Sequence, residues 1–312
     1  MQRSRIRSRR ARVAAAVAAV ATTLIIMPAG PAHAAFPGSN GRIAFESGRT
    51  DELDIYTAKP DGSDLQQLTA GLPSDHRPRW APDGSQIVFW RGTGDAGPGN
   101  IWIMDFDGSN KHRLTSGPAD DEDPAIGPDG EHVVFWRAKP SDDADLWIMT
   151  TDGTDKHRLT SSPSADVAPS WSVTNVIAFT SFRSGNGDVY TIHPNGTGLK
   201  RVTTKPTPDL YPDWSPDAAR LVFFTEGGGS TTSREVWRIK ADGTKLTRLT
   251  NNHVDDSYPS WSPNGRRITL QRDVREGDLD FYDVWTMRTN GTDLRRVTHD
   301  AFVDGVPNWQ PA

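Results

Sequence analysis

Six aspartates recur at one place in a repeated stretch of this sequence, each opening the pattern Asp-x-x-Pro. Each lies thirteen residues after the glycine of an Asn-Gly or Asp-Gly pair, so the spacing is the same in all six copies. Carboxylate oxygens are the ligands that Ca²⁺ takes in proteins, and they also pair with basic groups of a partner. If the copies surround an axis, we expect the carboxylates as a ligand-binding ring at one mouth of a central channel. The six are Asp75, Asp121, Asp166, Asp209, Asp256 and Asp304.

These aspartates allow a metal-binding and a structural interpretation. For a metal, the candidate ligands are Asp75, His76, Asp121 and Asp166, with Ca²⁺ as the expected cation. Alternatively, each aspartate accepts backbone N–H groups in a tight turn and pairs with an arginine that follows a strand. The arginines at that place are Arg49, Arg91, Arg137, Arg183 and Arg272. A feature present in every repeat is usually one that the repeat needs to fold, which favours the structural interpretation.

Aromatic side chains are the second candidate for a binding surface. Of the 11 tryptophans, five belong to a repeated Pro-x-Trp element and four occupy another repeated aromatic position. The remaining two, Trp90 and Trp136, share with Phe224 a position that is polar in the other copies. Because the repeat does not require an aromatic there, these three are candidate ligand contacts. The alternative is that they fill space between neighbouring sheets.

No catalytic motif accompanies these residues. The sequence contains no Gly-x-Ser-x-Gly, no His-Glu-x-x-His and no phosphate loop ending in Gly-Lys-Ser or Gly-Lys-Thr. It has no cysteine, which excludes disulfides and thiolate metal sites. These observations favour binding over catalysis.

The elements that position these residues form six repeats of 43 to 48 residues. Each copy has an apolar run rich in β-branched residues, such as the one from Ile87 to Trp90, as is typical of a strand covered on both faces. The Asn-Gly or Asp-Gly pair that follows is typical of a hairpin, and a Leu-Thr or Val-Thr pair ends the copy. The sequence therefore predicts an all-β, six-bladed β-propeller of four-stranded antiparallel blades.

The two ends of the repeat region predict how the ring closes. The first copy lacks the Pro-x-Trp element before its apolar run at Ile43, and the C-terminus has a surplus one at Pro307-Asn308-Trp309. We expect the C-terminal strand to complete the first blade, because this leaves no open sheet edge. The propeller domain is expected over residues 35–312.

Most of the length variation between copies falls between the second and third strands of the repeat. The spacing from the apolar position at Phe45 to the aromatic position at Tyr56 is 11 residues, and it reaches 15 in the last copy. In a four-stranded antiparallel blade these loops emerge on the same face as Asp-x-x-Pro. Variable loops on a regular scaffold are common binding elements, so this face is the expected binding face.

The first 34 residues are predicted to be a secretory signal peptide. Six arginines between Arg3 and Arg12 precede an apolar stretch, and Ala32-His33-Ala34 provides a cleavage signal. Either general or twin-arginine export fits this segment. The net charge is −5, and without these six arginines 29 basic residues stand against 40 acidic ones. This acidic balance leads us to expect no nucleic-acid partner. No segment after the first 34 residues approaches ~20 consecutive apolar residues, so we expect no membrane insertion. We also expect a monomer.

The Pro-x-Trp-Ser-Pro-Asp-Gly pattern, the apolar strand and the Leu-Thr end resemble the repeat of TolB-like propellers, a WD-repeat-like family. Ser215-Pro216-Asp217 and Ser262-Pro263-Asn264-Gly265 show the likeness best. The resemblance covers the propeller portion alone, without the additional N-terminal domain of TolB. It implies an extracytoplasmic protein that acts through protein contacts.

Taken together, the sequence predicts a secreted, noncatalytic platform that binds a protein or peptide at one face of the ring, without a required cofactor. The alternative is a metal-assisted propeller enzyme, of the lyase or lactonase type, acting on an extracellular polysaccharide or ester.

Overall fold

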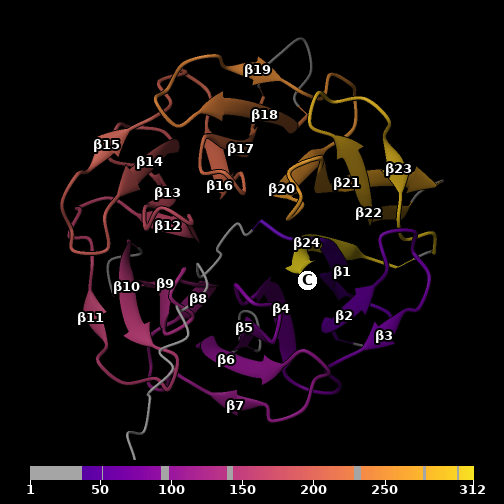
Figure 1. Cartoon of the computed structure of the whole chain (residues 1–312), viewed down its shortest axis with the longest axis horizontal. Helices are drawn as coiled ribbons and strands as arrows, with labels where there is room; N and C mark the ends of the chain where they lie inside the picture. The colour runs from indigo at the N-terminus through magenta and orange to yellow at the C-terminus, as the bar shows by residue number, and fades with distance from the viewer. Residues whose placement is uncertain are drawn as a thin grey trace, which may run out of the picture. The chain divides into compact units, whose positions relative to one another are not determined.

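The computed structural model describes residues 37–50, 52–92, 98–138, 143–227, 233–276, 279–300 and 302–312. Six four-stranded sheets surround a central axis, which confirms the predicted all-β six-bladed propeller (Figure 1). The expected signal peptide, residues 1–34, lies outside the described residues, as do parts of the variable loops. No helix among the described residues is long and apolar enough to cross a membrane.

Each blade places its four strands in order from the axis to the rim. The innermost strands are β4 (Ser74–Trp80), β8 (Asp121–Ile126), β12 (Asp166–Trp171), β16 (Asp209–Trp214), β20 (Asp256–Trp261) and β24 (Asp304–Pro311). The second strands are β1 (Asn40–Ser47), β5 (Gln86–Gly92), β9 (His132–Ala138), β13 (Ile177–Ser181), β17 (Arg220–Thr225) and β21 (Arg267–Glu276). The third strands are β2 (Asp54–Ala58), β6 (Asn100–Asp105), β10 (Ala144–Thr150), β14 (Asp188–Ile192), β18 (Glu235–Lys240) and β22 (Leu279–Arg288). The two-residue outer strands are β3 (Gln66–Gln67), β7 (His112–Arg113), β11 (His157–Arg158), β15 (Lys200–Arg201), β19 (Thr247–Arg248) and β23 (Arg295–Arg296).

Blade 1 combines the two ends of the chain, as predicted. Its order is β24-β1-β2-β3, and blades 2 to 6 then follow in sequence from β4–β7 to β20–β23. Within blade 1, Ile43 is paired with Trp309 and Ala44 with Asn308. The C-terminal strand therefore supplies the innermost strand that the first repeat lacks.

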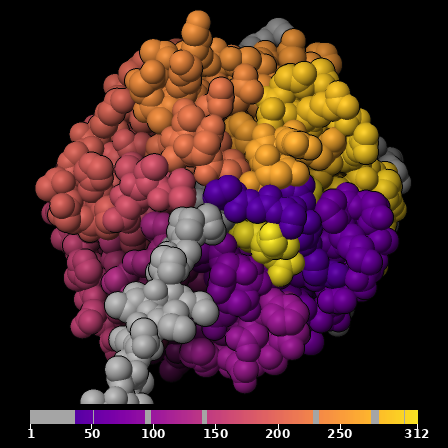
Figure 2. Space-filling model, viewed as in Figure 1, coloured from indigo at the N-terminus to yellow at the C-terminus, as the bar shows by residue number. Residues whose placement is uncertain are grey.

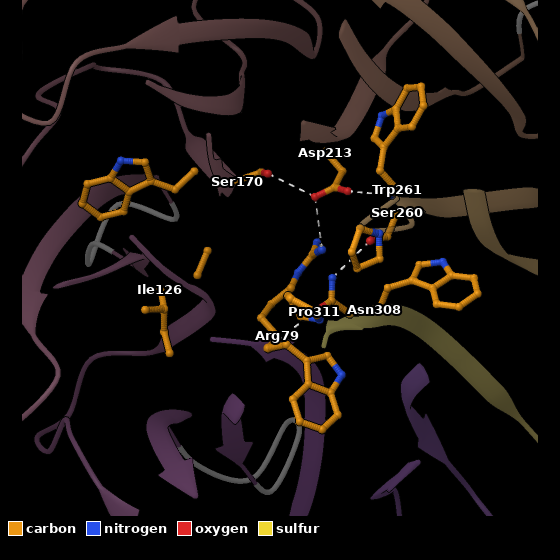
Figure 3. Close-up of a pocket in the computed structure, with 13 residues that line it drawn as sticks. Arg79, Ile126, Ser170, Asp213, Ser260, Trp261, Asn308 and Pro311 are labelled. Atoms are coloured by element: carbon orange, nitrogen blue, oxygen red, sulfur yellow. Dashed lines mark hydrogen bonds and ion pairs between the residues drawn. The ribbon is translucent and has the colours of Figure 1, made fainter. Parts of the chain in front are cut away.

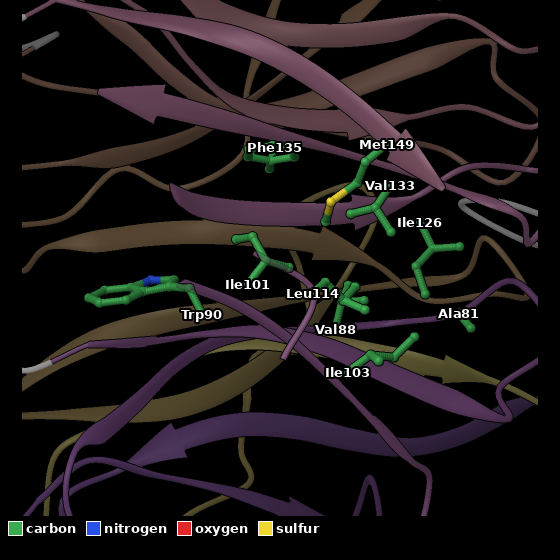
Figure 4. Packing of buried hydrophobic residues seen from close by; sticks show 10 residues of the cluster. All are labelled: Ala81, Val88, Trp90, Ile101, Ile103, Leu114, Ile126, Val133, Phe135 and Met149. Carbon is green, nitrogen blue, oxygen red and sulfur yellow. The ribbon is translucent and has the colours of Figure 1, made fainter. Parts of the chain in front are cut away.

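The hydrophobic core lies between neighbouring blades. The second-strand phenylalanines, such as Phe89 and Phe135, are fully buried because another sheet covers each face. One such layer, between blades 2 and 3, joins Val88 and Ile101 to Val133 and Phe135 (Figure 4). Continuous apolar strands are therefore required, as the sequence indicated.

The repeated threonine and glycine fix the outer part of each blade. In blade 1 the Thr69 hydroxyl accepts the N–H of Ile55 at 2.8 Å and donates to Asp54 at 3.2 Å, so it joins the outer strand to the third strand. Gly62 has a φ of +82°, and a Cβ there would lie 2.1 Å from the carbonyl oxygen of Val297 in blade 6. Glycine is needed both for the turn and for the close approach of the next blade.

The ring has two faces with different connections. The "hairpin face" carries the turns between first and second strands and between third and fourth strands, and the "loop face" carries the other connections. Figure 2 shows the hairpin face, where the first described residues, in indigo, lie at the centre of the ring beside the yellow C-terminal residues. There the Ser39 N–H donates to the carbonyl oxygen of Ala312 at 3.0 Å and the Gly38 N–H to that of Pro263 at 3.3 Å.

Replacing Trp309 with alanine should strongly destabilise the ring. Trp309 is 3% exposed and packs with Ile43, Phe45 and Val284, so its removal leaves a cavity at the closure. We expect a loss of about 3–5 kcal/mol in the free energy of unfolding, measured by urea denaturation. Leu72→Ala, at a side chain that is 78% exposed, is the control and should change stability by less than ~0.5 kcal/mol. Equal, small effects of both variants would contradict closure through Trp309.

Candidate functional site

The six aspartates of Asp-x-x-Pro are buried in ion pairs. None is more than 1% exposed. In blade 2, Asp75 accepts hydrogen bonds from Nε and Nη2 of Arg91 at 2.5 and 2.6 Å. Four further aspartates are also paired with an arginine: Asp121 with Arg137, Asp166 with Arg183, Asp256 with Arg272 and Asp304 with Arg49. These contacts support the structural interpretation, in which each aspartate pairs with an arginine after the second strand. The five arginines are those that the sequence indicated.

Blade 5 forms the same contact with a different cation. Asp209 lies 2.9 Å from Nζ of Lys205, which precedes it in the chain, and also accepts a hydrogen bond from Thr225 at 2.6 Å. The lysine therefore replaces the arginine that follows the second strand in the other blades.

Each of these cations also lies over the aromatic ring of the third strand. The distances to the ring centroids run from 4.0 Å for Lys205 over Trp237 to 5.3 Å for Arg272 over Trp285. Such contacts add cation–π attraction to the ion pair. The repeated aspartate, cation and aromatic thus form one buried unit in every blade, which we call the "blade triad".

The candidate metal ligands are not brought together. Asp75, Asp121 and Asp166 are each in a blade triad, and His76 stacks on Trp90 with ring centroids 4.1 Å apart. Nδ1 of His76 lies 3.6 Å from Glu46. Within the part of the chain that the structure describes, no three His, Asp or Glu side chains are grouped as a metal site would require.

The second residue after each triad aspartate has a left-handed backbone conformation. Its φ lies between +47° and +53°, and a β-bulge interrupts the pairing of the first two strands at this point. This conformation is uncommon for residues other than glycine and is unfavourable for β-branched Val306. The six bulge residues are Arg77, Asp123, Ala168, Tyr211, Tyr258 and Val306.

The position that holds Trp90, Trp136 and Phe224 lies beside these bulges. Where it is polar, the side chain accepts the N–H of the next blade's bulge residue: Glu46 from Arg77 at 3.0 Å, for example. Thr180 and Gln271 do the same for Tyr211 and Val306. Blades 2, 3 and 5 have an aromatic there instead.

Two of these three aromatics join a cluster at the loop-face end of the channel. Nε1 of Trp136 donates to Asp123 at 2.9 Å, and Asp123 is paired with Arg77. The Arg77 guanidinium lies 5.1 Å from the ring centroid of Tyr211, which stacks on Phe224 at 5.6 Å. We call this group the "mouth cluster"; its members are Arg77, Glu122, Asp123, Trp136, Tyr211, Phe224 and Tyr258. Trp90, 9% exposed, lies on His76 instead.

Glu122 is the carboxyl of the mouth cluster whose protonation is most altered. Burial, with a further contribution from Asp123, raises its pKa to about 7, and Arg77 opposes this rise. The Glu122 side chain is 20% exposed and its carboxylate comes no closer than 4.0 Å to Arg77. Burial alone would lower the pKa of Arg77, but Asp123 and the two tyrosines raise it well above its ordinary value. Arg77 is therefore a fixed cation, whereas Glu122 can exchange a proton near neutral pH.

A second polar network crosses the axis below the mouth cluster. Arg79 of blade 2 lies 3.6 Å from Asp213 of blade 5, on the opposite side of the ring (Figure 3). Asp213 also accepts hydrogen bonds from the Ser170 hydroxyl at 3.1 Å and the Trp261 N–H at 2.8 Å. These residues line a cavity of about 50 Å³ on the axis. Arg77 and Arg79 of β4 thus both reach across the channel to β16.

Sequence reasoning found the scaffold of this site and missed its centre. Arg77, Tyr211 and Tyr258 occupy the second variable position of Asp-x-x-Pro, and Arg79 and Asp213 the variable position of Pro-x-Trp. A signal for them was available in the sequence. These positions differ from copy to copy, although the residues on either side of them in the innermost strand are repeated. Trp136 and Phe224 were singled out by similar reasoning.

The fold and the repeated triad define a six-bladed propeller in which the side chains at the channel mouth differ from blade to blade. The family model of the TolB beta propeller domain matches residues 123–312, and the chain belongs to this family. Among solved structures, TolB from Acinetobacter baumannii has a TM-score of 0.74 at 21% identity, over 87% of this chain and 67% of that one. A putative TolB from Agrobacterium tumefaciens has a TM-score of 0.65 at 18% identity, over 84% and 90%.

More distant propellers share the fold alone. An oligogalacturonate lyase in complex with manganese has a TM-score of 0.52 at 14% identity, over 84% of this chain and 74% of that one. The search of curated protein sequences finds no match.

The blade triad should behave as a coupled unit in blade 6. Asp256→Ala leaves the guanidinium of Arg272 buried without its partner and should cost about 3 kcal/mol of unfolding free energy. Because Arg272→Met removes the same contact, the double variant should be more stable than the sum of the single effects predicts, by about 2 kcal/mol. Urea denaturation of the four proteins measures this coupling. Additive effects within ~0.5 kcal/mol would contradict the triad.

Glu122→Gln should change how stability depends on pH. The pKa of Glu122 is about 7 in the folded chain and about 4.5 in the unfolded chain. Between these pH values the folded chain therefore binds a proton at Glu122 that the unfolded chain has released. The contribution of Glu122 to stability therefore falls as pH rises from about 4.5 to 7. Since glutamine does not titrate, the variant should gain about 2–3 kcal/mol relative to the parent between pH 4.5 and pH 8. A constant difference across these pH values would contradict the raised pKa.

Proposed function

We propose that this chain is a noncatalytic binding protein, exported from the cytoplasm, that takes a protein or peptide partner at the loop-face mouth of the channel. The observation that carries this proposal is the mouth cluster, in which aromatic and charged side chains of blades 2, 3, 5 and 6 converge. The repeat does not need these side chains, because other copies have Ala168 or Val306 at the bulge and Thr180 beside it.

The composition of the mouth cluster suits a peptide ligand. Tyrosine and tryptophan provide rigid contact surfaces with a polar end, and arginine is common in the central contacts of interfaces. Beneath the cluster, the contact between Arg79 and Asp213 crosses the axis, so a ligand at the mouth would rest on a polar base. The described ends of the variable loops lie on the same face, and the half-buried Val167 and Leu210 lie next to the bulges.

The proposal requires neither a metal nor a catalytic group. The six triad aspartates already have cationic partners, so a cation would have to displace an arginine or lysine to reach them. Export is proposed from the arginine-rich, apolar N-terminal sequence and its Ala32-His33-Ala34 signal.

Site-specific photo-crosslinking in cells tests which face binds. A crosslinking residue at Leu210, on the loop face, should capture a defined partner, and one at Glu131, an exposed residue of a hairpin-face turn, should not. With the purified partner, Leu210→Arg should weaken binding at least tenfold in calorimetry, because it places a charge at the mouth. Glu131→Lys is the matched control and should leave the affinity unchanged.

Two outcomes would overturn this proposal. One is a partner that crosslinks at Glu131 and not at Leu210. The other is turnover of a polysaccharide or lactone by the purified chain that Glu122→Gln abolishes, which would identify the mouth as an active site.

A further inference from the structure

Blades 1 and 6 each have an equivalent ion cluster on the hairpin face. In blade 1, Arg42 at the start of the second strand donates to Asp64 at 2.7 Å and to the Thr57 hydroxyl at 2.9 Å. In blade 6, Arg267 does the same with Asp293 at 2.8 Å and Thr286 at 3.2 Å. The aspartate lies two residues after the hairpin glycine in both blades. In both blades, therefore, a carboxylate pairs with the arginine at this end of the blade.

Blade 5 has the arginine of this cluster without its acceptors. Arg220 occupies the place of Arg267, since it pairs with Lys240 as Arg267 pairs with Arg288. Arg238 replaces the threonine, and Lys245, two residues after Gly243, replaces the aspartate. Two substitutions thus replace both side-chain acceptors of the arginine with cations.

These cations line a pocket of about 260 Å³, which we call the "blade 5 pocket". Its lining consists of Arg220, Arg238, Ile239, Lys240, Lys245 and Thr247. Burial and the nearby charge of Arg220 lower the pKa of Arg238, as expected where like charges are crowded.

The acidic side chains around this pocket are peripheral. Asp217 lies 3.6 Å from Arg220 and is 61% exposed. Asp242 accepts hydrogen bonds from Thr244 within its own hairpin. Among the described residues, none of those that line the pocket is acidic.

The backbone does not explain why lysine stands at position 245. Lys245 has a φ of +58°, in the left-handed region that favours glycine, asparagine and aspartate. The equivalent residues of the other blades are of these types: Asp64, Asn110, Asp155, Gly198 and Asp293. Lysine is thus unfavourable for the backbone and for the local electrostatics.

We propose that the blade 5 pocket is an anion-binding site for a phosphate group. A phosphate monoester has a charge between about −1.5 and −2 and three acceptor oxygens, so it neutralises several cations at once, whereas a carboxylate carries one charge. Arginine is well suited to it, because its planar fork donates two parallel hydrogen bonds. The bound phosphate would take the place that the Asp64 and Asp293 carboxylates hold in blades 1 and 6. The site lies on the hairpin face and is independent of the proposed peptide site.

Titration of the mature chain with inorganic phosphate at constant ionic strength tests this site. We expect saturable binding by calorimetry and a rise in melting temperature that chloride does not produce. Lys245→Asp restores the aspartate of blades 1 and 6 at a position whose backbone favours it, so it should fold normally and weaken phosphate binding at least tenfold. Lys59→Asp makes the same charge change on the hairpin face of blade 1 and should leave the affinity within twofold.

Phosphoserine and vesicles with anionic phospholipid distinguish the source of the phosphate. Binding of phosphoserine that Lys245→Asp abolishes indicates a soluble phosphomonoester, and binding of vesicles alone with the same sensitivity indicates a lipid headgroup. Equal losses in Lys245→Asp and Lys59→Asp would show a general effect of net charge and overturn the proposal. An absence of saturable binding would overturn it as well.

Discussion

The buried ion pair of the blade triad is the interaction on which the rest of this propeller depends. A carboxylate that is almost without solvent exposure is stable only when it is paired, and each of the six has an arginine or lysine within hydrogen-bonding distance. The pair links the beginning of the innermost strand to the second strand or, in blade 5, to the connection before it. Because the cation also covers the aromatic ring of the third strand, one contact holds three strands in register. In blade 1 the same contact, between Arg49 and Asp304, joins residues from opposite ends of the chain.

The triad also explains how side chains reach the axis. With the aspartate fixed, the chain forms a bulge two residues later, and its left-handed residue lies at the channel end of the innermost strand. The scaffold tolerates very different side chains there, from Ala168 to Arg77. It is therefore able to present a blade-specific set of groups without altering its own contacts. The second polar network, in which Arg79 contacts Asp213 across the ring, closes the channel beneath these side chains.

The sequence predicted those features that depend on repetition, and it did not predict contacts between unlike repeats. The blade number, the strand order and the closure through Trp309 follow from spacings that recur six times. Five triad arginines could be named for the same reason, whereas Lys205 could not, because it reaches Asp209 from the preceding connection. The contact of Arg77 with Tyr211 joins blades 2 and 5 across the axis, and no repeat spacing encodes which side chains meet there. Trp90 and Trp136 occupy the same repeat position, yet one stacks on His76 and the other donates to Asp123, since their neighbours differ.

In a protein whose blades are structurally equivalent, each blade is a control for the others. Residues that stability requires recur around the ring, and a departure from them needs either a local compensation or another cause. Lys205 is a compensated departure, because a cation still reaches Asp209. Lys245 and Arg238 have no carboxylate partner among the described residues, and both add positive charge next to Arg220 where blades 1 and 6 have an aspartate and a threonine. Arg238 donates to a backbone carbonyl, that of Thr289, at 2.6 Å. The mouth cluster differs from both, because its residues contact one another through the Arg77–Asp123 ion pair, the Trp136–Asp123 hydrogen bond and the aromatic contacts of Tyr211. Burial beside Asp123 raises the pKa of its remaining carboxyl, Glu122. Departure from the repeat is therefore what singles out positions in this chain for a role in binding: side chains that the repeat does not require at the mouth cluster, and charge without a carboxylate partner at the blade 5 pocket.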